Sequence, residues 1–278
     1  NNVIRKITPA GVVSTLAGDG TAGYADGSGT AAKFSGPWKV AIDNDNNVIV
    51  ADRDNFKIRK VTPAGEVSTI AGSVAGTQDG VGAGAQFMQP LDVAVDKLGN
   101  IYVADNTAHR IRKVTPTGTV TTLAGSTAGA KDGTGAAAQF KNPSGLTVDG
   151  EGNVIVADRI NNRIRKVTPD GAVTTVAGTG VAGGQDGNAA EATFNNPYGV
   201  AVDKNGNILV VDLAGARLRK ITPEGVVSTL AGSAAGYADG LSAGAKFNQP
   251  TDLDVDADGN IYITDLTNNR IRKVRPVK

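Results

Sequence analysis

The stretch NIYVADNTAHRIRKVTP, residues 100–116, decides the fold because versions of it recur along the whole chain. Its Arg-Lys pair returns at an interval of 53 or 54 residues each time, at positions 5–6, 59–60, 112–113, 165–166, 219–220 and 272–273. Self-similarity at a fixed spacing is typical of repeat architectures, in which each repeat is one structural unit. The sequence therefore predicts one continuous array, a single domain over residues 1–278.

Each repeat has the pattern of four short strands. In the third repeat, residues 144–148 (SGLTV) and 154–158 (VIVAD) flank a polar turn, which predicts a hairpin. Residues 164–168 (IRKVT) and 172–177 (AVTTVA) flank a Pro-Asp-Gly turn and predict a third and a fourth strand. The strands are nearly continuous apolar runs, as in a sheet that is covered on both faces. This pattern predicts an all-β fold, a β-propeller of four-stranded antiparallel blades.

A long glycine-rich loop joins each fourth strand to the next repeat. It carries an Asp-Gly pair, then a phenylalanine, then a proline, for example Asp26-Gly27, Phe34 and Pro37. We expect the Asp-Gly pair to form a turn. We expect the phenylalanine to anchor the loop on its blade, since one buried aromatic side chain contributes ~2 kcal/mol.

The pattern PxGVAVDxxGNIYVADxxNxRIRKVTPxGxVSTLAG, which is clear at residues 197–212 and 268–274, resembles the NHL repeat. The inserted GxxDGxxxxAxF loop resembles a bacterial variety of it. The resemblance covers essentially the whole chain and implies a propeller fold. It leaves function open, because the family includes protein-binding and RNA-binding modules, teneurin-like surface proteins and, more distantly, lyases and lactonases.

The number of blades follows from the strand count. The chain begins inside a third strand and ends after another, so the third strand occurs once more than the other three. We predict five blades, with the ring closed by pairing of residues 253–274 with the strand at 12–17, which would protect an open edge. The alternative is an incomplete six-bladed propeller that needs half a blade from elsewhere.

Bulk composition limits the classes of partner that we expect. The 28 Lys and Arg against 27 Asp and Glu give a net charge of +1, so no bulk charge favours nucleic acid or an anionic membrane. The chain has no cysteine and no apolar run of 18 residues, and it starts without methionine. We expect a soluble part of a larger bacterial protein, without cofactor or membrane insertion, that is monomeric unless its ring closes by strand exchange. Its compartment stays open, with an extracellular, periplasmic or cell-surface location favoured.

Each second strand ends in aspartate, and a basic residue follows five residues later. This predicts a structural ion pair in every repeat, at Asp52 with Lys57, Asp105 with Arg110, Asp158 with Arg163, Asp212 with Arg217 and Asp265 with Arg270. The acidic turns between the first and second strands superficially resemble calcium loops. They lack a glutamate at the twelfth position, and one contains Lys97, so they are better explained as hairpin turns than as metal sites. The lone His109 is expected to be exposed to solvent.

The candidate binding site consists of positions that vary between repeats on the loop face of a propeller. They follow the loop proline or the aspartate of the second strand: Trp38, Lys39, Arg53, Leu91, Asp92, Arg159, Tyr198, Thr251 and Asp252. Aromatic and arginine side chains are enriched at interaction hot spots. The alternative for these positions is ordinary surface variation without a function.

The sequence thus favours a non-enzymatic scaffold that binds a protein or small ligand through the face around Trp38 and Tyr198. One alternative is a lactonase-like or lyase-like enzyme with a metal in the central channel, for which Asp92 and Asp252 are the only acidic candidates. A second alternative is RNA binding, which would require the Arg-Lys pairs to form an outward basic stripe.

Overall fold

A computed structural model describes residues 1–275 and confirms the all-β fold. The chain divides into two compact units, Asn1–Leu123 and Ala124–Lys278. The predicted single domain over 1–278 and the closing pair of 253–274 with 12–17 concern the relation between these units, and both stay predictions. No helix within residues 1–275 is long and apolar enough to cross a membrane.

The four predicted strands of each repeat form as the sequence pattern indicates. The first strands begin at the loop proline: β4 (Pro37–Ile42), β9 (Pro90–Val95), β14 (Pro143–Val148), β19 (Pro197–Val202) and β23 (Pro250–Val255). The second strands end at the aspartate: β5 (Val48–Asp52), β10 (Ile101–Asp105), β15 (Val154–Asp158), β20 (Ile208–Asp212) and β24 (Ile261–Asp265). Proline suits a strand start because it cannot donate a ladder hydrogen bond.

The third and fourth strands flank the Pro-x-Gly turn. The third strands are β1 (Ile4–Ile7), β6 (Lys57–Val61), β11 (Arg110–Val114), β16 (Arg163–Val167), β21 (Arg217–Ile221) and β25 (Arg270–Val274). The fourth strands are β2 (Val13–Ala17), β7 (Glu66–Ala71), β12 (Thr119–Ala124), β17 (Ala172–Ala177) and β22 (Val226–Ala231). The turn glycines have positive φ, for example +87° at Gly65, which explains why glycine recurs there.

The long loops contribute elements that the sequence did not predict. Four of them supply a two-residue strand: β3 (Gly27–Ser28), β8 (Gly80–Val81), β13 (Gly133–Thr134) and β18 (Gly187–Asn188). Short 3-10 helices follow in the loops or between second and third strands: η1 (Gly29–Ala31), η2 (Arg53–Asn55), η3 (Gly82–Gly84), η4 (Gly135–Ala137), η5 (Arg159–Asn161) and η6 (Ser242–Gly244).

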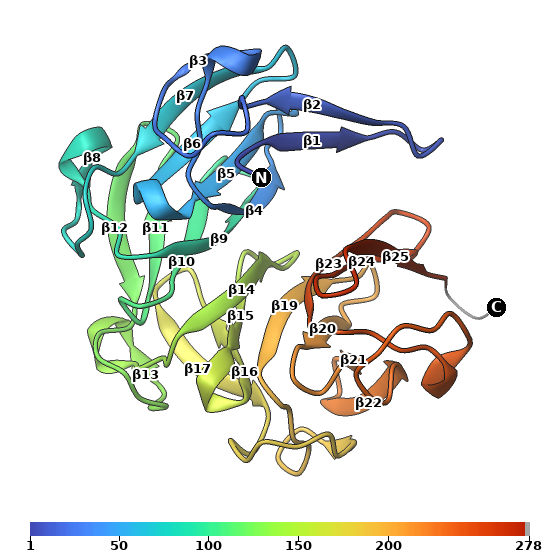
Figure 1. Cartoon of the computed structure of the whole chain (residues 1–278). Helices are drawn as coiled ribbons and strands as arrows, with labels where there is room; N and C mark the ends of the chain where they lie inside the picture. Colours follow the sequence, from blue (N-terminus) through green and yellow to red (C-terminus); the bar gives the residue numbers. More distant parts are fainter. Residues whose placement is uncertain (276–278) are drawn as a thin grey trace. The chain divides into compact units, whose positions relative to one another are not determined.

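In the first unit, two sheets have five antiparallel strands each, in the orders β3-β7-β6-β5-β4 and β8-β12-β11-β10-β9, and β1 pairs with β2 in a separate hairpin (Figure 1). In the second unit, β13-β17-β16-β15-β14 and β18-β22-β21-β20-β19 repeat this order, and β23-β24-β25 form a three-stranded sheet. The four-stranded antiparallel blade is therefore confirmed, with the two-residue strand added at its outer edge. We call these four five-stranded sheets complete blades.

Neighbouring sheets within a unit pack through apolar side chains. In the first unit, Ile49 and Ile58 of one complete blade join Val103 and Val120 of the next in one buried cluster. The predicted loop anchors are confirmed, because the recurring phenylalanines are at most 1% exposed: Phe34, Phe87, Phe140, Phe194 and Phe247. Each complete blade is thus covered by side chains of its own loop as well as by its neighbour.

Candidate functional site

Trp38 is the most exposed aromatic member of the predicted binding face. It follows Pro37 at the start of β4, where the register against β5 is irregular, and it is 39% exposed. The guanidinium carbon of Arg53, at the start of η2, lies 4.6 Å from the centre of the indole ring. Arg53 is itself held by Asp54, with Nε 2.7 Å from Oδ1. The first unit therefore presents an indole ring stabilised by a cation–π contact.

Lys39 and Asp92 lie beside this pair but are not available as surface groups. They come from β4 and β9 of adjacent blades, and Lys39 Nζ is 3.0 Å from Asp92 Oδ2. Lys39 is 5% exposed and Asp92 4% exposed, and Leu91 is also buried at 4%. The sequence placed all three on a binding face. The structure instead uses the charged pair to link two strands, which is how a buried charge is compensated.

In the second unit, Arg159 and Tyr198 also form a cation–π pair, at 5.3 Å. Arg159 Nε donates to Asn196 Oδ1 at 2.8 Å. Tyr198 is only 4% exposed, so its ring offers little surface to a partner. Ser144, the second residue of the neighbouring first strand β14, donates its hydroxyl to the backbone oxygen of Tyr198 at 2.9 Å.

Thr251 and Asp252 are half-buried at the start of β23. The hydroxyls of Thr251 and Thr264 lie 3.0 Å apart. Asp254, two residues further along the strand, was not singled out from the sequence. Asp254 is exposed, but desolvation by the surrounding protein raises its pKa, as does the nearby charge of Asp252; the hydrogen bond that it accepts from the backbone N–H of Val255 opposes this rise. Two neighbouring carboxylates of this kind disfavour simultaneous ionisation.

The predicted ion pairs need correction. The five aspartates are all fully buried, but each pairs with the arginine seven residues later and not with the basic residue five residues later. The distances are 2.7 Å for Asp52–Arg59, 3.3 Å for Asp105–Arg112, 2.7 Å for Asp158–Arg165, 3.5 Å for Asp212–Arg219 and 2.8 Å for Asp265–Arg272. The second amino group of each arginine binds the loop aspartate at 2.6–2.8 Å: Asp26, Asp79, Asp132, Asp186 and Asp239.

The physical reason for this pairing lies in the shape of the arginine side chain. Its planar fork can donate to two carboxylates and two backbone carbonyls together, and these hydrogen bonds offset the free-energy cost of burying the charge. Four of the residues predicted as partners bind backbone oxygens instead; Lys57 Nζ, for example, donates to the Ser73 oxygen at 2.7 Å. The others are Arg110 with Thr77, Arg163 with Ala130 and Thr179, and Arg270 with Asn268. The charge of Arg217 lowers the pKa of Asp212 and so opposes the effect of burial.

Two further expectations have different outcomes. The acidic hairpin turns behave as turns: Asp43 Oδ1 accepts the backbone N–H groups of Asp45 and Asn47 at 2.9 and 2.8 Å. Within residues 1–275, no group of three or more His, Cys, Asp or Glu side chains is arranged to hold a metal ion. The expectation for His109 is wrong, since this residue is half-buried. It has φ +57° at a position that is left-handed in every repeat, the others being Phe56, Asn162, Ala216 and Asn269.

Comparison with known proteins decides the family. The NHL repeat model matches residues 34–61, 87–114, 140–167 and 247–274, and the teneurin NHL domain model matches residues 181–239. The chain is an NHL-repeat propeller. Each of the four segments that the NHL repeat model matches spans the first, second and third strands of one repeat, including the aspartate and arginine of the buried pair.

Similar proteins include Protein SUPPRESSOR OF QUENCHING 1, chloroplastic, from Arabidopsis thaliana, 30% identical over 75% of this chain and 22% of that protein. Teneurin-4 of Mus musculus is 28% identical over 100% of this chain and 12% of that protein. The NHL-repeat chain therefore spans less than a quarter of the length of these two relatives. Both are eukaryotic, so the expected bacterial origin stays a prediction.

The fold is also similar to that of catalytically inactive virginiamycin B lyase from Staphylococcus aureus, solved with quinupristin. The TM-score is 0.61 at 12% identity, over 99% of this chain and 74% of that one. At this identity the similarity concerns the NHL-type propeller fold alone.

Proposed function

We propose that this chain is a non-enzymatic, protein-binding propeller, and that Trp38 with Arg53 is the contact surface in its first unit. The supporting observation is an indole that is 39% exposed and yet fixed in orientation by Arg53 and Asp54. An ordered aromatic side chain loses little conformational entropy on binding and buries a large apolar area. Tyr198 is buried and is no longer part of the proposed surface.

The contacts of Asp92 give the enzyme alternative less support. Asp92 is one of the two acidic candidates, and it is engaged with Lys39 in a buried pair. RNA binding is likewise less supported, because the arginine of each Arg-Lys pair in the complete blades is fully buried: Arg59, Arg112, Arg165 and Arg219. The repeated pairs therefore do not form the outward stripe of arginine and lysine that RNA binding would require.

The proposal is tested in two steps. Proteins are first captured on the immobilised chain, and the affinity of each captured protein is then measured by titration against wild type, Trp38→Ala and Tyr262→Ala. Tyr262 is a matched control, since it is 38% exposed and also lies beside a cation, Lys273. We expect Trp38→Ala to weaken binding at least about 10-fold, equal to about 1.4 kcal/mol, and Tyr262→Ala less than about twofold. Equal affinities of wild type and Trp38→Ala for every captured protein would contradict the proposal.

A further inference from the structure

Two blades carry an arginine directly after the second strand, Arg53 in η2 of the first unit and Arg159 in η5 of the second. The backbone around the two arginines is alike. The N–H groups of the next residues, Asp54 and Ile160, each donate to a backbone oxygen of the preceding long loop, at 3.0 and 3.1 Å. The side chains around the two guanidinium groups can therefore be compared group by group.

The guanidinium of Arg53 is neutralised within its own blade. Its Nε donates to Asp54 Oδ1 at 2.7 Å, and its Nη2 donates to Asp54 Oδ2 at 3.0 Å. In the third repeat, Ile160 stands in the place of this aspartate. Arg159 donates through its Nε alone, to Asn196 Oδ1 at 2.8 Å. Within residues 1–275, Nη1 and Nη2 of Arg159 have no hydrogen-bond partner and form no ion pair.

The orientation of Arg159 is nevertheless fixed. Its guanidinium carbon lies 5.3 Å from the centre of the Tyr198 ring, which is buried and whose backbone oxygen accepts from Ser144. The hydrogen bond to Asn196 holds the Nε edge of the guanidinium. Because this orientation exists before a ligand binds, little side-chain entropy is lost when Nη1 and Nη2 engage an acceptor. A planar fork of this kind matches the two oxygens of a carboxylate.

A second cation and an apolar side chain accompany this fork. The backbone oxygen of Lys141 accepts the N–H of Ile160, so the two residues are neighbours. Lys141 is exposed and forms no ion pair in the part of the chain that the structure describes, and Ile160 is 37% exposed. Asp158, which precedes η5, is fully buried and is bound by Arg165 and Asn161. The two cations therefore remain available to an external carboxylate.

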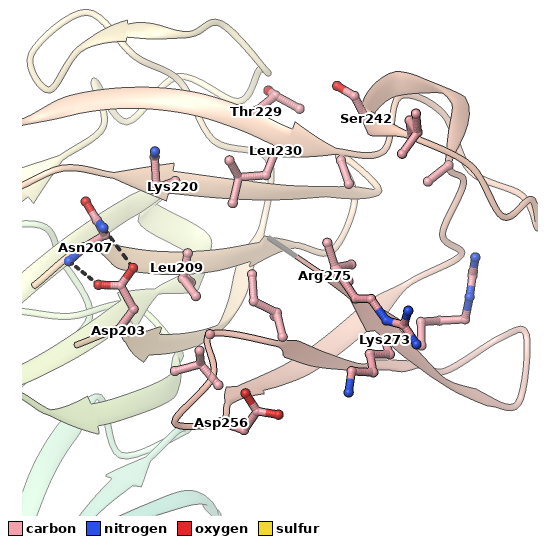
Figure 2. A pocket seen from close by; sticks show the side chains of 18 of the residues that line it. Asp203, Asn207, Leu209, Lys220, Thr229, Leu230, Ser242, Asp256, Lys273 and Arg275 are labelled. Atoms are coloured by element: carbon pink, nitrogen blue, oxygen red, sulfur yellow. Dashed lines mark hydrogen bonds between the residues drawn. The ribbon is translucent and has the colours of Figure 1, made fainter. Parts of the chain in front are cut away.

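The large cavity of the second unit does not offer this chemistry. It has a volume of about 1120 Å³, and side chains of both charges line it. Figure 2 shows Asp203 hydrogen-bonded to Asn207 in its wall, with Asp256, Lys220 and Lys273 also around it. A carboxylate in this cavity would meet aspartates as well as lysines, and like charges disfavour binding. An anion is therefore better accommodated at the arginine of η5, which does not line the cavity.

We propose that Arg159 and Lys141 form a binding site for a side-chain carboxylate of an acidic peptide segment, in the place that corresponds to Asp54 of the first unit. The proposal rests on the protein-binding function only in that the carboxylate belongs to a protein, and it does not involve Trp38. Nη1 and Nη2 of the arginine donate to the two carboxylate oxygens, and the lysine adds attraction by charge. Ile160 packs against an apolar residue next to the acidic one.

NMR titration with defined peptides tests the site. The probe is a heptapeptide blocked at both ends, with a central glutamate flanked by two leucines and glycines elsewhere; the control peptide has glutamine in place of the glutamate. We expect the glutamate peptide to shift the Arg159 Nε–H signal saturably and to bind at least about 10-fold tighter than the control. Equal affinities would overturn the proposal.

Two further ligands test the chemical class of the partner. The glutamine peptide with a free C-terminus offers a carboxylate that does not belong to a side chain, and inorganic phosphate offers a different anion. We expect both to bind more weakly than the glutamate peptide. Tighter binding of the first would overturn the assignment to a side chain, and tighter binding of phosphate would overturn the assignment to a carboxylate. Neither result bears on Trp38, which is tested separately with captured proteins.

Matched variants separate the fork from charge alone, with the amide signal of residue 160 as the readout. Arg159→Lys keeps the charge without the fork, and we expect it to bind the glutamate peptide at least about 10-fold more weakly. Ile160→Asp supplies the counterpart of Asp54 within the chain, so its carboxylate competes for the guanidinium. Ile160→Asn has the same size without the charge and should bind at least about 10-fold tighter than Ile160→Asp. Wild-type affinity in Arg159→Lys, or equal affinities of the two Ile160 variants, would overturn the proposal.

Discussion

Asp212 is the least well compensated of the five buried aspartates. In three repeats an asparagine three residues later donates to the aspartate at 2.8 Å: Asn55 to Asp52, Asn161 to Asp158 and Asn268 to Asp265. Gly215 stands at this place for Asp212, whose Oδ2 has no hydrogen-bond partner in the described chain. Burial, opposed by the Asn195 N–H and by Arg219, raises the pKa of Asp212 to about 6. The missing donor explains why this site differs from the other three.

We predict that Gly215→Asn stabilises the protein at pH 7. The new amide would donate to Oδ2 of Asp212 and contribute about 1 kcal/mol to the free energy of unfolding. The carboxylate must turn to the orientation that Asp52 has, because a Cβ at position 215 would lie 2.7 Å from Oδ2. Urea denaturation at pH 7 measures the change. A less stable variant would show that the carboxylate cannot turn.

The pH dependence separates this hydrogen bond from effects on the unfolded chain. Because the folded-state pKa of Asp212 is raised from 3.8 to about 6, its contribution to stability is greatest at low pH and is lost as pH rises through this window. Gly215→Asn should reduce that loss, so its advantage over wild type should grow between pH 4 and pH 7. Gly215→Ala places the same Cβ 2.7 Å from Oδ2 but supplies no donor, so it should not gain an advantage over wild type that grows between pH 4 and pH 7.

At the level of residues, the sequence identified the aspartates but not their partners. Lys57 does lie directly opposite Asp52 in the strand register, so the predicted proximity is correct. Arg59 pairs with Asp52 in place of Lys57 because its longer, forked side chain also reaches Asp26 of the loop. The joint recurrence of this arginine and the loop aspartate in every repeat was an available signal. The sequence did not reveal that Trp38 is exposed and Tyr198 buried, because both follow the loop proline of their repeat and differ in what packs around them.

Among the elements, the long loop depends most clearly on one buried side chain. In the third repeat, Arg165 Nη1 donates to the backbone oxygen of Gln139 and to Asp158, at 3.1 and 2.7 Å. Its Nη2 donates to the backbone oxygen of Lys131 and to Asp132, at 3.2 and 2.6 Å. One guanidinium therefore joins the end of β15 to both sides of the loop.

We predict that Arg165→Lys lowers the free energy of unfolding by about 3–5 kcal/mol, because an ammonium cannot reproduce the fork and leaves buried groups uncompensated. Amide hydrogen exchange in residues 131–139 should accelerate, which locates the effect in the loop. Lys166→Ala is the control, since Lys166 is only half-buried; it should change stability by less than about 0.5 kcal/mol. Unchanged protection of the loop in Arg165→Lys would refute the role of Arg165.

The sequence predicted the loop phenylalanine correctly but missed the two-residue strand beside it. A single large apolar residue in a stretch of small ones is a strong burial signal. Gly27 and Ser28, by contrast, pair with Val67 and Glu66 through backbone groups alone, and such pairing has no side-chain pattern. Strand partners across a long loop are set by tertiary packing, which a local pattern does not encode.

For the whole molecule, the period of 53 or 54 residues was sufficient to predict an all-β propeller, because one unit was repeated five times. The repeat does not fix the partner of a terminal strand: residues 13–17 carry the pattern of the fourth strands of complete blades, and β2 pairs with β1 in a separate hairpin. Strand pairing at the ends of the array depends on tertiary packing, which a local pattern does not encode.

The charge of the whole molecule leads to a prediction about nucleic acid. The net charge is +1, and five of the six Arg-Lys pairs contribute a buried arginine to an ion-pair network, so few of these arginines remain free to displace counterions. We expect single-stranded RNA to bind no tighter than about 10⁻⁴ M at physiological salt, the weak end of non-specific binding. Fluorescence anisotropy with a labelled oligonucleotide over a salt series measures this. Micromolar binding that weakens steeply with salt would contradict the prediction and would indicate a basic surface formed by residues outside these pairs.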